Sequence, residues 1–81
     1  MSESLLNKQM LIKLAETKMP YGRFAGRPII LLPEEYLLWF ANKSEFPKGE
    51  LGDLMKLALA LKIEGLEKLV FPLLPPDART S

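Results

Sequence analysis

The sequence predicts an α+β fold in which three to four helices pack against a short two-stranded β-hairpin. Apolar residues recur at helical spacing near both ends of the 81-residue chain. Between them, residues 18–33 hold three prolines and two glycines, a density that the interior of a helix does not tolerate. Hydrophobic residues make up 48% of the chain, which is ordinary for a globular protein, so we expect residues 1–81 to form a single domain.

The first helix is expected over residues 4–17. Apolar residues recur every four positions on one face from Leu6 onward, and Ser2 or Ser4 can cap the start of the helix.

Residues 19–31 are expected to form the hairpin, with residues 21–24 paired to residues 27–30. Gly26 would supply the positive φ that a tight turn needs. Pro28 has no amide donor for a ladder and therefore marks an edge strand. A two-stranded ribbon is marginal alone, so the hairpin is expected to lie on the helices.

A second helix is expected over residues 33–43, because Pro33 suits the first helical position and two carboxylates follow it. Residues 36–41 are all aromatic or apolar, which indicates a helix that is buried on more than one side. Trp39 is accordingly expected in the core.

A third helix is expected over residues 50–64, followed by a possible short helix over 66–71 and a tail over 72–81 that begins as an apolar strap. Four apolar residues lie off the main stripe of the third helix: Leu57, Leu59, Ala60 and Ile63. A helix that is apolar nearly all round is either central to a core or half of an interface, and both readings stay open, including a homodimer.

The composition excludes most catalytic chemistry. The chain has no histidine and no cysteine, so the usual general base, the thiol nucleophile and the common zinc ligands are missing. Glu50 and Asp53 could act as a carboxylate pair, but first-turn acids are better explained by the helix dipole. We therefore expect a protein that is not an enzyme and has no cofactor and no metal site.

The N-terminus does not resemble a signal peptide, and no apolar run approaches the roughly 20 residues that a membrane helix needs. A cytoplasmic protein with no membrane partner is expected. The net charge is only +1, but basic residues gather in the first third of the chain.

The basic segment supplies the candidate binding residues. Lys18, Arg23 and Arg27 are interleaved with Tyr21 and Phe24, a mixture of cations and aromatic faces that nucleic-acid-binding surfaces use. The alternative is that the two aromatic residues only hold the hairpin against the helices.

Three segments resemble a known family. Residues 19–29 read Met-Pro-Tyr-Gly-Arg-Phe-Ala-Gly-Arg-Pro-Ile, residues 32–40 read Leu-Pro-Glu-Glu-Tyr-Leu-Leu-Trp-Phe, and residues 46–52 read Phe-Pro-Lys-Gly-Glu-Leu-Gly. They resemble the short bacterial proteins called putative quorum-sensing-regulated virulence factors. The resemblance covers residues 19 to about 70 and leaves the first helix outside.

Similar segments accompany exonuclease domains of the proofreading type, which implies by analogy an accessory role on nucleic acid. The family's name implies regulated expression, and no catalytic residue comes with the resemblance.

The sequence therefore predicts a non-enzymatic binding module that contacts nucleic acid through Lys18, Arg23, Arg27, Tyr21 and Phe24. The alternative is a protein-interaction or dimerisation module that uses the third helix and the proline-rich segment 72–76.

Overall fold

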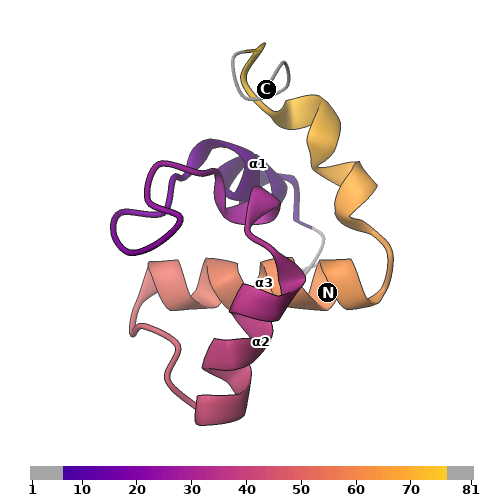
Figure 1. Cartoon of the computed structure of the whole chain (residues 1–81). Helices are drawn as coiled ribbons and strands as arrows, with labels where there is room; N and C mark the ends of the chain where they lie inside the picture. Colours follow the sequence, from indigo (N-terminus) through magenta and orange to yellow (C-terminus); the bar gives the residue numbers. More distant parts are fainter. Residues whose placement is uncertain (1–6, 77–81) are drawn as a thin grey trace.

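Helices form the whole framework of the described chain. The computed structural model describes residues 7–76, and these contain three α-helices and three 3₁₀ turns: α1 (Lys8–Glu16), η1 (Ile29–Leu31), α2 (Glu34–Lys43), α3 (Glu50–Ile63), η2 (Glu67–Leu69) and η3 (Phe71–Leu73). In Figure 1, α3 lies between α1 and α2, and it packs against both of them as well as against η1 and η2. The fold is all-helical, so the α+β prediction is wrong.

The hairpin predicted for residues 19–31 is not formed. Lys18 and Pro28 make an isolated antiparallel bridge, and no strand occurs within residues 7–76. The Met19 N–H donates to the Arg27 carbonyl at 2.9 Å, and the Gly26 N–H donates to the Met19 carbonyl at 2.7 Å. Residues 18–28 are thus a loop closed at its base, which we call the closed loop.

Prolines and glycines explain why the pairing stops there. Pro20 and Pro28 have no N–H with which to extend a ladder. Gly22 and Gly26 adopt φ values of +85° and +89°, so the chain between them folds into successive turns. Gly26 does supply a positive φ, but it does so in a closed loop and not in a hairpin.

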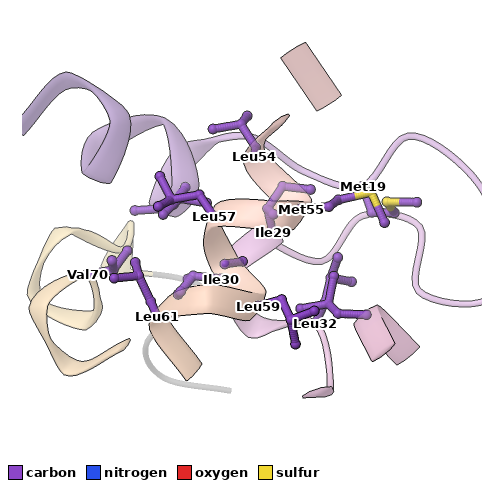
Figure 2. Packing of buried hydrophobic residues seen from close by; sticks show 14 of the residues in the cluster. Met19, Ile29, Ile30, Leu32, Leu54, Met55, Leu57, Leu59, Leu61 and Val70 are labelled. Carbon is purple, nitrogen blue, oxygen red and sulfur yellow. The ribbon is translucent and has the colours of Figure 1, made fainter. Parts of the chain in front are cut away.

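The segment expected as the second strand enters the core as η1. Ile29 and Ile30 are fully buried, and η1 packs against both α1 and α3. Figure 2 shows these two side chains beside Leu57 and Leu61 of α3.

The first helix starts later than expected. Asn7 caps α1 by accepting the Gln9 N–H on its side-chain oxygen at 2.7 Å. The expected caps Ser2 and Ser4, like the other residues before Asn7, lie outside the described residues. Leu14 and Ala15 bury the inner face of α1.

The second helix is only partly buried. Leu37 is its one fully buried residue, and Trp39 is 50% exposed. The expectation that Trp39 lies in the core is therefore wrong. Tyr36, Leu38, Phe40 and Ala41 pack half-buried against the core around Leu37, and Trp39 is the large residue of α2 that this packing leaves exposed.

The third helix is the centre of the core. Its buried residues lie on several sides: Gly52, Leu54, Met55, Leu57, Ala58, Leu59 and Leu61. Leu57 and Leu59, which lie off the main stripe, are thus covered within the same chain, while Ala60 and Ile63 are exposed. The central place of this helix explains the burial of Leu57 and Leu59, and the homodimer stays a prediction.

The C-terminal segment closes over the same core. A short helix was possible over residues 66–71. The structure has instead η2, a turn and the start of η3 in this segment. The η3 turn packs against α1. Val70 and Leu74 are buried, so this segment is an apolar strap. Residues 77–81 of the predicted tail lie outside the described residues. No helix within residues 7–76 has both the length and the apolar composition to cross a membrane.

Gly52 is required where α3 begins, because the preceding loop lies directly against the helix. A Cβ atom at this position would stand 1.7 Å from the carbonyl oxygen of Pro47, a backbone atom that cannot rotate away. We expect Gly52→Ala to lower the free energy of unfolding by about 1–3 kcal/mol, the usual cost of overpacking, despite the helix propensity of alanine.

Urea unfolding followed by circular dichroism measures this effect. The reverse change at an exposed position of the same helix, Ala60→Gly, should cost about 1 kcal/mol through propensity alone. A Gly52→Ala protein that is more stable than the parent would contradict the close contact.

Candidate functional site

None of the aromatic residues of this chain is fully buried, and four of them pack against the edge of the core: Phe24, Tyr36, Phe40 and Phe46. The fully buried side chains within residues 7–76 are leucine, isoleucine, valine, methionine and alanine. All four phenylalanines, both tyrosines and the single tryptophan are exposed or half-buried. This is unusual because aromatic side chains normally supply much of the apolar area that a small core buries.

Five of these rings are linked by pairwise contacts into one cluster, which we call the aromatic surface: Phe24, Tyr36, Phe40, Trp39 and Phe46. The ring centroids of Phe24 and Tyr36 are 4.8 Å apart, and those of Tyr36 and Phe40 are 5.1 Å apart, both edge to face. Phe40 also meets Trp39 edge to face at 5.1 Å and stacks on Phe46 at 5.9 Å.

The spacing along α2 places three of these rings together. Residues 36, 39 and 40 are separated by three and four positions and therefore lie on one side of the helix. Leu37 lies on the side that faces the core. Phe24 comes from the closed loop, and Phe46 arrives after Ser44 turns the chain at φ 55°.

Cations lie over the aromatic surface along its length. The guanidinium carbons of Arg23 and Arg27 are 5.3 and 4.8 Å from the centroid of the Phe24 ring. Lys43 lies over Trp39 at 6.0 Å, and Lys56 lies over Phe46 at 5.8 Å. These distances fall within the range of cation–π attraction.

None of these four cations is held by a carboxylate within residues 7–76. The ion pairs there join Lys13 to Glu50 and Lys62 to Glu67, both away from the aromatic surface. The positive charge over the rings is therefore open to an anionic ligand.

An open pocket of about 540 Å³ lies between the closed loop and α2. It is lined by Arg23, Phe24, Pro33, Glu35, Tyr36, Trp39 and Phe40. Its walls are mainly aromatic faces, with one guanidinium and one carboxylate, which suits a flat, partly polar ligand.

The structure brings together three of the five residues predicted from the sequence. Arg23, Arg27 and Phe24 meet at the pocket end of the aromatic surface. Tyr21 is 51% exposed at the closed loop, and Lys18 is exposed at the base of that loop beside Pro28. That these five residues bind nucleic acid stays a prediction.

Sequence reasoning missed the residues that α2 and its flanks contribute. Glu35, Tyr36, Trp39, Phe40 and Lys43 all face the pocket or the aromatic surface. A signal was present, because Leu37 and Ala41 already form an apolar stripe that leaves Tyr36, Trp39 and Lys43 on another face.

Tyr36 lies at the middle of this arrangement. Burial, and to a lesser extent the nearby phenol of Tyr21, raise the pKa of Tyr36 above its ordinary value of 10.0. Its hydroxyl lies near Gly22, where an added Cβ would meet it at 3.4 Å. Tyr36 thus packs the closed loop against α2.

Of the two carboxylates considered as a pair, Glu50 takes part in an ion pair of the fold. Glu50 forms an ion pair with Lys13, which joins the start of α3 to α1. Within residues 7–76, no group of three or more acidic residues is arranged to hold a metal ion.

Comparison with known proteins places the chain among bacterial relatives. The family described as "Putative quorum-sensing-regulated virulence factor" matches residues 7–73, so α1, which the sequence resemblance left out, lies inside the match. "Uncharacterized protein YpeB" of Escherichia coli strain K12 is 56% identical over 71 residues, which cover 88% of this chain and 99% of that protein. The protein of the same name from Escherichia coli O157:H7 matches equally. No solved structure matches the chain.

The raised pKa of Tyr36 predicts a stability change at high pH. The folded protein keeps the phenolic proton where the unfolded chain begins to lose it, near about pH 10. The free energy of unfolding should therefore be unaffected well below pH 10 and should fall as the pH rises through the folded pKa.

Urea unfolding at a series of pH values from about 8 to about 11 checks this expectation, because this range brackets the ordinary pKa of tyrosine. The free energy of unfolding of Tyr36→Phe should fall less steeply with pH than that of the parent. Tyr21→Phe should keep most of the decline, because burial is the larger cause of the raised pKa of Tyr36. Equal slopes for the parent and Tyr36→Phe would show that another group is responsible.

Proposed function

This chain belongs to the family of putative quorum-sensing-regulated virulence factors, and we propose that it is a non-enzymatic module that binds single-stranded nucleic acid on the aromatic surface. The names of the relatives state no ligand, so the proposal rests on the geometry of this surface.

One observation supports the proposal most strongly. Five rings form one connected cluster at the edge of a core whose fully buried side chains are aliphatic. Trp39 is exposed, and the other four rings are half-buried against the core. Leaving aromatic area in water forgoes stabilisation of the fold, because apolar burial contributes about 25 cal/mol per Å². A connected aromatic cluster that keeps part of its area in water, with Trp39 exposed, is typical of a binding surface.

The cations decide which class of ligand fits. Arg23, Arg27, Lys43 and Lys56 surround the rings and have no carboxylate partner within the described residues. Single-stranded nucleic acid is bound by this pairing, in which bases stack on aromatic side chains and phosphates lie near Lys and Arg. Each stacked base is worth about 1–3 kcal/mol by alanine substitution.

The proposal favours single strands over duplex. Bases in a duplex are already stacked on one another and cannot reach a protein ring without being unpaired. Trp39, at 50% exposure, presents a face that an unpaired base could cover. Duplex DNA would meet only the cations.

A salt titration tests the role of the cations. We expect a labelled eight-residue oligo(dT) to bind with a logarithmic salt slope of about −2 to −3, from three to four phosphate contacts at about 0.7 each. Replacing Arg27 and Lys43 together by alanine should make the slope shallower by about 1.4. The stability of the fold should change little, because both side chains are exposed.

The matched control removes the same charge elsewhere. Lys8 of α1 and Lys68 of η2 are exposed and do not lie over rings of the aromatic surface. If Lys8→Ala with Lys68→Ala changes the slope as much, or if the parent protein binds no oligonucleotide at low salt, the proposal is wrong.

A further variant separates stacking from charge. Trp39→Ala should weaken oligo(dT) binding by about 5- to 100-fold and leave the salt slope unchanged, because a ring contributes no counterion release. Phe71→Ala, which removes an exposed ring of η3 away from the aromatic surface, should have no effect on affinity.

A further inference from the structure

The geometry points to a guanine base of the bound strand as the occupant of the pocket between the closed loop and α2. This inference rests on the proposed function and adds to it the identity of one base.

The walls of the pocket suit a planar ring. Phe24, Tyr36, Trp39 and Phe40 line it, and its volume of about 540 Å³ leaves room for a purine with part of its sugar. The pocket is open, so a base can enter while the strand continues along the aromatic surface.

Two charged residues line the pocket and come from different elements. Glu35 lies on α2 one turn before Trp39, and Arg23 lies on the closed loop beside Phe24. They do not pair with each other or with another residue within 7–76, since the ion pairs there involve neither. The pocket therefore offers a ligand one acceptor group and one donor group.

The chemistry of these two groups selects among the bases. A carboxylate only accepts hydrogen bonds and matches two neighbouring donors, whereas a guanidinium only donates and matches two neighbouring acceptors. Guanine presents the N1–H and N2–H donors on one edge and the O6 and N7 acceptors on another.

The other bases match Glu35 and Arg23 less well. Adenine and cytosine each offer one amino group beside a ring nitrogen that accepts, so a carboxylate would face an acceptor as well as a donor. Thymine and uracil offer a single N–H between two carbonyls. Only guanine gives two hydrogen bonds to Glu35 and two to Arg23.

Base preference is measured with four labelled eight-residue oligo(dT) strands that carry G, A, C or T at one central position. The strand with a single G should bind about 5- to 100-fold tighter than the all-T strand, as a good bidentate contact provides. Glu35→Gln should remove this preference while binding to the all-T strand persists, which shows that the variant is folded.

The neighbouring carboxylate provides the matched control. Glu34 is exposed on α2 beside Glu35 but does not line the pocket. Glu34→Gln removes the same charge and should keep the preference for G. Equal loss in both variants would mean that net charge, and not the pocket, sets the preference, and the inference would be overturned.

Modified bases test each edge separately. Inosine lacks the N2 amino group and should weaken binding to the parent protein but not to Glu35→Gln. A 7-deazaguanine lacks the N7 acceptor and should weaken binding to the parent but not to Arg23→Lys, which cannot form the two parallel bonds. If neither base changes the affinity, guanine does not sit between these two groups.

The outcomes distinguish this inference from the proposed function. If all four strands bind equally and with the expected salt slope, the protein binds single strands but the pocket does not select guanine. If no strand binds, both proposals fail. Competition with free GMP identifies the source of the base: GMP should compete far more weakly than the G-containing strand, and equal affinity would contradict a strand as the ligand.

Discussion

The burial of α3 on several sides is the constraint on which the rest of this structure depends. Leu54, Leu57 and Leu59 point in different directions from one helix, so that helix must be surrounded. A chain of 81 residues has few elements with which to surround it, and α1, η1, α2 and η2 are all used. Each of these elements covers part of α3, and η1 lies buried between α3 and α1.

The aromatic surface follows from that arrangement. Leu37 is the one fully buried residue of α2, Tyr36 and Phe40 pack half-buried at the edge of the core, and Trp39 is exposed beside them. The closed loop, held by two backbone hydrogen bonds at its base, brings Phe24 and two arginines against the same side. The same helix therefore contributes both to the core, through Leu37, and to the candidate site, through Tyr36, Trp39 and Phe40.

The sequence predicted the helices better than it predicted their surroundings. Periodicity and helix-end signals placed α2 and α3 to within a residue or two, because such signals are local. The hairpin failed because Pro20 and Pro28 lack amide donors, so a pattern of turn residues led to a closed loop and not to strands. Trp39 was assigned to the core because large rings usually belong there, and only the packing of α2 on α3 reveals that this ring faces outward.

The fluorescence of Trp39 tests the central claim most directly, because it is the only tryptophan and it lies on the aromatic surface. Unlabelled single-stranded oligonucleotide should quench this fluorescence saturably, over the concentration range in which the strand binds, because a base stacks on the indole. The corresponding duplex should quench it much less. If the strand binds while the emission of Trp39 stays unchanged, the ligand contacts another face of the protein and the account given for the aromatic surface is wrong.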